Sequence, residues 1–247
     1  MLNEPTTEKL QTLRLGAMLA AWQDQASHSE MAQLGFDERF GLLVEAEWLH
    51  RENQRMARNL REAKLRLSHA TIEDIDYSAR RELDRAQIRQ LATCRWVTEH
   101  QNILICGATG TGKTFIACAL AHQACRHGHR VLYRRTSRLF DELTLARADG
   151  TYTAVLAKLA RGAVLIIDDF ALAPLDPQHR HDLLDLLEDR YGVRSTIVTS
   201  QLPVAKWHAH IDDPTLADAI CDRLLHNAHR LELKGPSKRR TEAEPKP

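Results

Sequence analysis

The chain has 247 residues, 43% of them hydrophobic and 27% charged, with a formal net charge of +1. These values are typical of a folded globular protein, and the length allows one α/β domain with a smaller appendage, because single cores stop growing at roughly 250 residues. The sequence has neither a signal peptide nor an apolar run near the ~20 residues that span a bilayer, which argues against a membrane protein and favours a cytoplasmic one with reduced cysteines.

Residues 1–68 predict a small all-helical N-terminal domain of two helices, joined near residues 27–35. The second helix carries an apolar stripe whose members recur three and four residues apart: Leu42, Ala46, Leu49, Asn53, Met56, Leu60, Ala63 and Leu67. The first helix repeats this rhythm with Leu10, Leu13, Ala17 and Ala20. We favour an antiparallel hairpin in which the two stripes bury each other; the alternative is a seam between molecules, registered by Asn53.

The opposite side of the second predicted helix is basic. Four arginines fall there when residues are placed at about 100° each: Arg51, Arg55, Arg58 and Arg66. Such a face suits DNA phosphates, although a solvated surface is an equally good interpretation of the charges. We therefore expect the N-terminal domain to serve DNA contact or assembly.

A charged connector over residues 69–99 leads to an α/β domain over residues 100–235. Short apolar runs rich in strand formers are separated there by helix-length stretches: residues 102–106, 131–133, 164–167 and 196–199. Strands that alternate with helices predict a parallel sheet covered by helices on both faces. A fifth strand is expected at residues 230–233, and the charged tail over residues 236–247 is expected to be disordered.

A phosphate-binding loop joins the first of these strands to the next helix. The segment Gly107-Ala108-Thr109-Gly110-Thr111-Gly112-Lys113-Thr114, followed by Phe115, matches the G-x-x-x-x-G-K-[ST] pattern in full. Glycines let such a loop wrap closely, so that backbone N–H groups and the helix N-terminus face the phosphates. We expect Lys113 to reach the β- and γ-phosphates and the Thr114 hydroxyl to bind Mg²⁺. The segment through Phe115 therefore predicts ATP and Mg²⁺ as cofactors.

Two adjacent carboxylates, Asp168 and Asp169, follow the strand at residues 164–167. Acids at the carboxyl edge of a buried strand are costly unless they meet a cation, and the phosphate-binding loop supplies one. We assign Asp168 to the magnesium shell and Asp169 to polarising the water that attacks the γ-phosphate. The chain is therefore predicted to be a magnesium-dependent ATPase.

Other polar residues have weaker signals. Gln201 follows the fourth strand and is a candidate for holding the attacking water or the γ-phosphate, with loop capping as the alternative. Arg223 stands among apolar residues of a predicted helix, where an arginine usually only solvates its charge. The five cysteines form no C-x-x-C pair, and we interpret them as structural. The closest histidine pairs lack the spacing of a helical zinc site: His208/His210 and His226/His229.

The order of the motifs over residues 102–239 resembles that of the IstB/DnaC-like AAA+ ATPases. The motifs are the phosphate-binding loop, Asp168-Asp169, Thr199-Ser200-Gln201-Leu202-Pro203, Asp222-Arg223-Leu224-Leu225-His226 and Gly235-x-Ser237-x-Arg239. Four features are most similar to the IstB-like transposition helpers of bacterial insertion sequences: the helical N-terminus, Arg190-Tyr191, Trp207 after the Pro203 turn, and Arg223-Leu224-Leu225-His226.

The resemblance implies an ATPase that assembles on double-stranded target DNA as a homo-oligomer, with ATP at subunit interfaces, and that recruits or stimulates a transposase. It puts Gln201 at the sensor-1 position, Arg223 at that of a finger reaching a neighbour's ATP, and Arg239 at the second sensor. Many family members have glutamate where Asp169 stands and asparagine where Gln201 stands.

Three other functions share a phosphate-binding loop. A replicative-helicase loader of the DnaC type has the same fold, but loaders tend to carry a zinc-binding N-terminus, whereas this chain has no cysteine before Cys94. A small-molecule kinase predicts a lid with arginines and an acceptor pocket, and the sequence indicates neither. A DNA-coating scaffold would use ATP only to assemble. The sequence favours the transposition helper over these three functions.

Overall fold

The computed structural model describes residues 4–77 and 82–237. Contacts divide the chain into two compact units, Met1–Arg58 and Asn59–Pro247. The boundary falls within helix α3 (Phe36–Ala63), which begins in the first unit and ends in the second.

The described part of the first unit is helical. Its elements are α1 (Glu4–Thr12), α2 (Gly16–Ser27), the 3₁₀ helix η1 (Ser29–Gln33) and most of α3. The prediction of a single first helix is wrong, because the chain breaks between α1 and α2. At the break, Arg14 has a φ of 58°, a left-handed conformation that ends a right-handed helix.

Helices α2 and α3 form an antiparallel hairpin, and a buried carboxylate joins them. The Glu47 side chain accepts hydrogen bonds from the backbone N–H groups of Ala17 (3.0 Å) and Met18 (3.1 Å), at the N-terminus of α2. An anion is favoured at a helix N-terminus. Near the other end of α2, the side-chain amide of Gln25 donates to the Arg39 carbonyl at 2.9 Å. Polar contacts thus hold both ends of the hairpin.

The apolar stripe of α3 is only partly buried. In the first unit, Leu42 and Leu49 remain 47% and 46% exposed, and Leu19 is the buried apolar side chain of α2. The later stripe members Leu60 and Ala63 pack into the core of the second unit. The expectation that two stripes bury each other is therefore wrong for the first half of α3.

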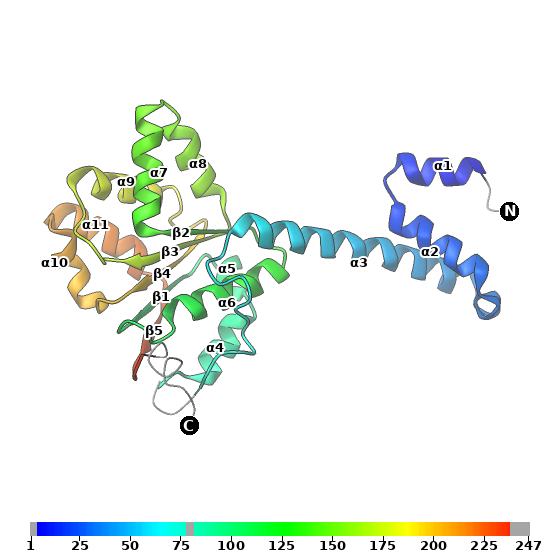
Figure 1. The fold of residues 1–247 in the computed structure, drawn as a ribbon, viewed down its shortest axis with the longest axis horizontal. Coiled ribbons are helices and arrows are strands. Elements are labelled where there is room, and N and C mark those ends of the chain that lie inside the picture. Colours follow the sequence, from blue (N-terminus) through cyan, green and yellow to red (C-terminus); the bar gives the residue numbers. More distant parts are fainter. Residues whose placement is uncertain (1–3, 78–81, 238–247) are drawn as a thin grey trace, which may run out of the picture. The chain divides into compact units, whose positions relative to one another are not determined.

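The second unit is built on a five-stranded parallel sheet (Figure 1). The strand order is β2-β3-β4-β1-β5. The strands are β1 (Asn102–Gly107), β2 (Val131–Arg135), β3 (Val164–Phe170), β4 (Ser195–Ser200) and β5 (Ala228–Leu233). All five predicted strands are confirmed. Because every pair is parallel, the carboxyl ends of β1, β3 and β4 meet at one edge of the sheet.

Helices cover both faces of this sheet (Figure 1). One face carries α4 (Arg85–Ala92), α5 (Arg95–Thr98) and α6 (Lys113–Arg126). The other carries α7 (Thr136–Ala148), α8 (Tyr152–Arg161), α9 (Pro177–Glu188), α10 (Trp207–Ile211) and α11 (Pro214–Leu225), with the 3₁₀ helix η3 (Val204–Lys206) before α10. None of the helices in the described ranges has both the length and the apolar character that a membrane crossing requires.

Side chains of β1 alternate between the two cores. Ile103 and Ile105 belong to the cluster under α6, whereas Leu104 and Cys106 belong to the cluster on the opposite face. Successive residues of a strand point to opposite faces, so a strand covered on both sides must be apolar throughout. This explains the uninterrupted apolar run from which the strand was predicted.

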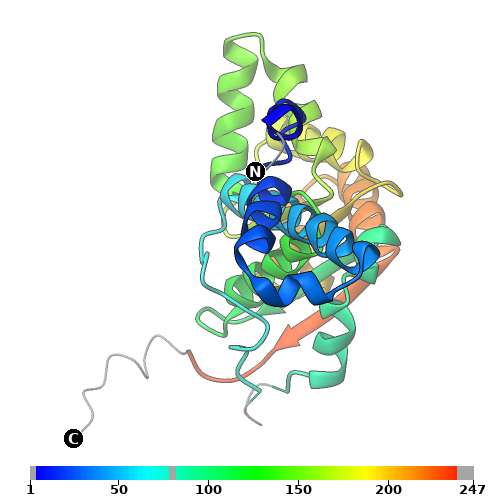
Figure 2. The same ribbon diagram turned by 90° about the vertical axis from the view of Figure 1, so that its right-hand side faces the viewer.

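Much of the predicted connector belongs to the core of the second unit. Leu91 and Trp96 are buried in the cluster that contains α6. The Gln87 side chain donates to the Arg230 carbonyl at 3.2 Å, which joins α4 to β5, the edge strand visible in Figure 2. The compact unit begins at Asn59, so the divisions at residues 68 and 99 remain predictions about functional segments.

All five cysteines are free thiols, and four of them are buried. Burial raises the pKa of Cys94, Cys106 and Cys118 to about 11 and that of Cys125 to about 12. They pack in the core as small apolar side chains, in agreement with their structural interpretation.

Candidate nucleotide-binding site

The predicted phosphate-binding loop joins the end of β1 to the start of α6. Gly110 and Gly112 have φ values of 83° and 96°, in the left-handed region that residues with a side chain rarely adopt. A Cβ at Gly107 would collide with the carbonyl oxygen of Leu233 in β5. Helix α6 begins at Lys113, so the N–H groups of its first turn stand where a helix favours an anion. The loop therefore has the backbone of a phosphate site.

The Lys113 side chain is buried and lies along the loop. Its Nζ donates to the carbonyl oxygens of Gly107 (2.8 Å) and Ala108 (2.9 Å). The Thr111 hydroxyl donates to the same Ala108 carbonyl at 2.8 Å. These bonds keep the ammonium group inside the curve of the loop, where it is available to the phosphates of a bound nucleotide.

Asp168 is fully buried in β3 and accepts hydrogen bonds from three hydroxyl groups. Its Oδ1 accepts from Thr114 (2.9 Å) and Thr199 (2.6 Å), and its Oδ2 accepts from Tyr133 (2.5 Å). Burial, and then the bond to Asp168, raise the pKa of Tyr133, so its hydroxyl stays protonated and donates. The Thr114 contact joins the phosphate-binding loop to β3.

Asp169 points into the same site as the preceding carboxylate because β3 is irregular there. The pairing of β3 with β4 shifts between Ile167 and Phe170, and Asp169 has a φ of 58°. A bulge of this kind re-aims a side chain that would otherwise point to the other face of the sheet. The Oδ2 of Asp169 lies 3.0 Å from Nε of Arg135 and 3.7 Å from Nη1 of Arg66.

Arg66 belongs to this site, which corrects its predicted place on the basic face of α3. The helix ends at Ala63, and Lys64 has a φ of 50°, so the chain has left the helix before it reaches Arg66. Its Nη1 lies 3.7 Å from the Oδ2 atoms of both Asp168 and Asp169.

The other three predicted DNA-binding arginines lie on α3 in the first unit. Arg51 donates to Glu47 at 2.8 Å, and this bond is the main cause of the lowered pKa of Glu47. Arg55 donates to Glu52 at 2.8 Å. Arg58 is exposed. Two of the three are thus paired along their own helix, and their contact with DNA stays a prediction.

A cleft of about 510 Å³ lies over the phosphate-binding loop. This volume is within the range of small-molecule sites. The Thr109 hydroxyl donates to Oε1 of Gln201 at 2.7 Å, which joins the loop to the end of β4 at the wall of the cleft. The apolar part of the wall comes from the segment after α3, the first turn of α6 and the chain after β3: Leu67, Ile75, Phe115, Ile116 and Leu172.

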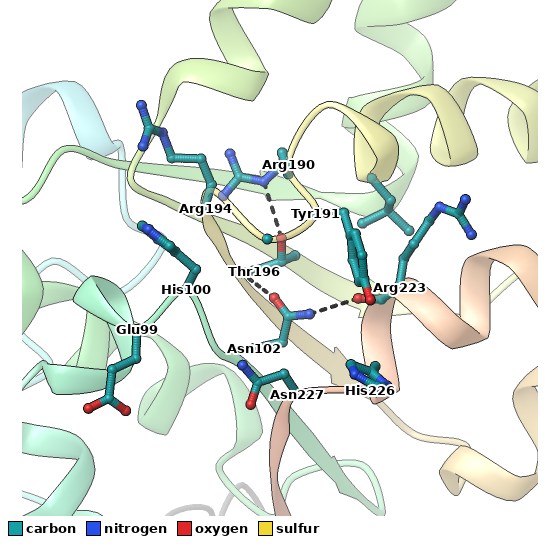
Figure 3. A pocket seen from close by; sticks show the side chains of 12 residues that line it. Glu99, His100, Asn102, Arg190, Tyr191, Arg194, Thr196, Arg223, His226 and Asn227 are labelled. Atoms are coloured by element: carbon teal, nitrogen blue, oxygen red, sulfur yellow. Dashed lines mark hydrogen bonds between the residues drawn. The ribbon is translucent and has the colours of Figure 1, made fainter.

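Arg223 lies at the opposite edge of the sheet, beside the first residue of β1 (Figure 3). Nδ2 of Asn102 donates to the Arg223 carbonyl at 3.0 Å. Strand β1 ends at Gly107, and five steps of about 3.3 Å put some 17 Å between the two edges. The Arg223 side chain pairs with Glu188 of α9. Arg223 is therefore remote from the phosphate-binding loop of its own chain.

A cavity of about 220 Å³ opens beside Arg223 (Figure 3). Arg190 contributes to its wall, although this side chain is only 1% exposed. Its guanidinium donates to the Thr196 hydroxyl (3.2 Å) and to the carbonyls of Leu159 (2.9 Å) and Gly162 (2.9 Å). Arg190 thus joins the end of α8 to β4 and is a structural arginine.

Arg239, the predicted second sensor, lies outside the described residues. The chain just before it reaches the loop, because a Cβ at Gly110 would collide with the Ser237 side chain. The end of the described chain therefore contacts the phosphate-binding loop.

A parallel sheet, a glycine-rich loop before α6 and a buried acid in β3 define a nucleotide-binding P-loop domain of the AAA+ class. The chain matches the family model described as IstB-like ATP binding protein over residues 8–245, and it belongs to that family. The family predicted from the order of the motifs is confirmed, and with it ATP as the ligand of the family.

Known relatives carry names that agree with this membership. A putative insertion sequence ATP-binding protein of Sinorhizobium fredii is 51% identical over 242 residues, which cover 98% of each chain. A putative ATP-binding protein in an insertion sequence of Mycobacterium tuberculosis is 33% identical over 231 residues, 93% of this chain and 92% of the relative.

Solved structures are similar in fold. The crystal structure of the DnaC helicase loader has a TM-score of 0.56 at 22% identity and covers 67% of this chain and 97% of that chain. The crystal structure of DnaI has a TM-score of 0.58 at 21% identity and covers 67% of this chain and 92% of that chain. At these identities the likeness confirms the AAA+ fold alone.

Proposed function

We propose that this chain is a magnesium-dependent ATPase that assembles on double-stranded DNA as a homo-oligomer and recruits or stimulates a transposase during insertion-sequence transposition. The observation that carries the proposal is the hydrogen bond between Thr114 and Asp168, which joins the phosphate-binding loop to a buried carboxylate. The insertion-sequence names of relatives at 46–51% identity support the biological setting.

The Thr114 hydroxyl and the Asp168 carboxylate fit a magnesium ion. Mg²⁺ prefers hard oxygen ligands, usually one or two from protein side chains, with water and phosphate oxygens completing the shell. A bound ion would supply positive charge to the transferring phosphoryl group. Lys113 then binds phosphate oxygens, Asp169 orients the attacking water, and Gln201 contacts the water or the γ-phosphate from the end of β4.

Phosphate release, measured with and without duplex DNA, tests the ATPase proposal. We expect DNA-stimulated turnover that Lys113→Ala abolishes, because the variant no longer balances the negative charge of the phosphates. Turnover that ignores DNA would favour a small-molecule kinase instead. ATP binding without turnover would favour a scaffold. A chain that promotes helicase loading and leaves its transposase unaffected would be a loader of the DnaC type.

Arg223 is proposed to act on ATP bound to a neighbouring subunit. It lies at the edge of the sheet where the parallel strands begin, about one strand length from its own phosphate-binding loop. A side chain cannot bridge that distance. An arginine supplied in trans stabilises the charge of the transferring phosphoryl group and contributes about 10³ to 10⁵ in rate. The Arg223 side chain pairs with Glu188 of its own chain, and this ion pair must open when a neighbouring subunit docks.

Mixing two inactive variants tests this assignment. Arg223→Ala keeps an intact phosphate-binding loop, and Lys113→Ala keeps an intact arginine. Mixed interfaces can join the two intact parts, so we expect ATPase activity to return in part. Co-assembly on DNA without any gain in activity would make Arg223 a structural arginine.

Exposed apolar side chains on α3 support the assembly part of the proposal. In the first unit these side chains fall on two sides of the helix: Phe36, Phe40, Val44 and Trp48 on one side, and Leu42 and Leu49 on the other, which is also the side of Asn53. A second copy of the helix can cover the side of Leu42 and Leu49, with Asn53 fixing the register. Replacing Leu42 and Leu49 by serine should lower the association constant measured by sedimentation. An unchanged association constant would mean that α3 forms only the intramolecular hairpin and no interface between copies.

A further inference from the structure

The guanidinium of Arg66 stands between the two carboxylates of the proposed hydrolytic site. Its Nη1 lies 3.7 Å from Oδ2 of Asp168 and 3.7 Å from Oδ2 of Asp169. Arg66 also lines the cleft over the phosphate-binding loop, together with Lys113. An arginine of the same chain thus faces the place where the terminal phosphate of ATP is expected.

The backbone around Arg66 is anchored by its buried neighbours, whereas the Arg66 side chain is partly exposed. Leu65 before it is buried, and Leu67 after it packs partly buried against the same core. The Arg66 side chain itself is 42% exposed, and its 3.7 Å contacts are longer than direct hydrogen bonds. The segment therefore fixes the backbone position of Arg66 and leaves its side chain room to turn toward the cleft.

Nucleotide binding changes the charges around Arg66. Two carboxylates face two guanidinium groups in this site, because Arg135 also contacts Asp169, at 3.0 Å. A cation held by Asp168 would compete with Arg66 for the carboxylate oxygens, and a bound triphosphate would bring new acceptor oxygens into the cleft that Arg66 lines. Guanidinium groups bind phosphate and carboxylate oxygens with similar bidentate geometry, so either group can serve as the partner of Arg66.

We propose that Arg66 senses ATP in its own subunit: when ATP binds, its guanidinium exchanges the carboxylates of Asp168 and Asp169 for the γ-phosphate. The inference rests on the proposed ATPase function and adds a phosphate ligand from outside the loop. ADP lacks the γ-phosphate, so Arg66 favours ATP over ADP. Arg135 keeps Asp169 paired when Arg66 turns away.

Equilibrium binding without turnover tests the proposal. The probes are a fluorescent, non-hydrolysable ATP analogue and a fluorescent ADP, each with Mg²⁺. For Arg66→Gln we expect the dissociation constant of the ATP analogue to rise about tenfold, as for the loss of a charge-assisted hydrogen bond, and that of ADP to change less than about twofold. Arg66→Lys keeps the charge, so its dissociation constant for the ATP analogue should lie between those of the wild-type chain and Arg66→Gln. Arg61→Ala, which removes an exposed arginine from the last turn of α3, is the matched control.

The two nucleotides separate sensing from a structural role. An equal rise in both dissociation constants would make Arg66 a residue that only maintains the site, and no change in either would restrict it to pairing with the carboxylates. Both results overturn the proposal. If the wild-type chain shows no DNA-stimulated ATP turnover, the proposed function is contradicted. The comparison of dissociation constants would still test whether Arg66 binds the γ-phosphate.

Discussion

Removal of the Tyr133 hydroxyl tests whether hydroxyl donors hold the Asp168 carboxylate in place. Tyr133 donates to Oδ2 at 2.5 Å, and Asp168 is fully buried. Tyr133→Phe leaves this oxygen with the Arg66 guanidinium at 3.7 Å. A hydrogen bond to a charged group contributes about 1.5–3 kcal/mol, and the guanidinium offsets part of its loss. We expect the free energy of unfolding to fall by about 1.5–2 kcal/mol, which lowers Tm by roughly 3–8 °C.

The same variant should bind magnesium about 10- to 100-fold more weakly, because groups that hydrogen-bond a ligating carboxylate also orient it. Thermal unfolding without nucleotide and a Mg²⁺ titration of ATP-analogue binding provide the two measurements. Tyr191→Phe, which removes a hydroxyl from a partly exposed ring, is the control. If Tyr133→Phe melts with the control and keeps its Mg²⁺ dependence, the hydroxyl does not position Asp168 and the reasoning fails.

Four further outcomes are expected. Asp169→Asn should retain ATP binding and lose about 10² or more in hydrolysis, since the water loses its orienting carboxylate; equal losses of binding and turnover would assign Asp169 to the metal shell. Reversing Arg55 and Arg58 to glutamate should weaken DNA binding at all sequences and flatten its salt dependence, and an unchanged slope would make them solvated surface. Arg190→Met should destabilise the fold by at least about 3 kcal/mol in urea unfolding, because several buried carbonyls lose their donor, whereas a midpoint like that of wild type would contradict this role. The four buried thiols, with pKa values raised to about 11 or 12, should react slowly with a thiol reagent at pH 8 until the protein unfolds; rapid native reaction would refute their burial.

The local parts of the site could be predicted because each depends on neighbouring residues. The glycines of the loop require backbone conformations that other residues avoid, and Lys113 and Thr114 follow them at the start of a helix. Asp168 ends an apolar run long enough for a buried strand. The strands β1, β2, β3 and β4 could be recognised from their apolar runs, since a strand covered on both faces must be apolar along its length. The edge strand β5 instead alternates polar and apolar residues.

Tertiary structure alone decided which distant residues complete the site. Tyr133 and Thr199 reach Asp168 because β2 and β4 flank β3, and a strand order is a long-range pairing that no local pattern encodes. Asp169 joins them through an irregular pairing of β3 with β4.

The same distinction explains the two arginines. Helical periodicity put Arg66 on the outer face of α3, but the helix ends at Ala63 and the chain turns Arg66 toward the carboxylates. Arg223 was recognised from its motif, whereas its distance from the loop follows from the parallel sheet, which has phosphate-binding residues at one edge and Arg223 at the other. Periodicity determines which residues share a face only as far as the helix continues, and long-range packing determines where it stops and what it meets.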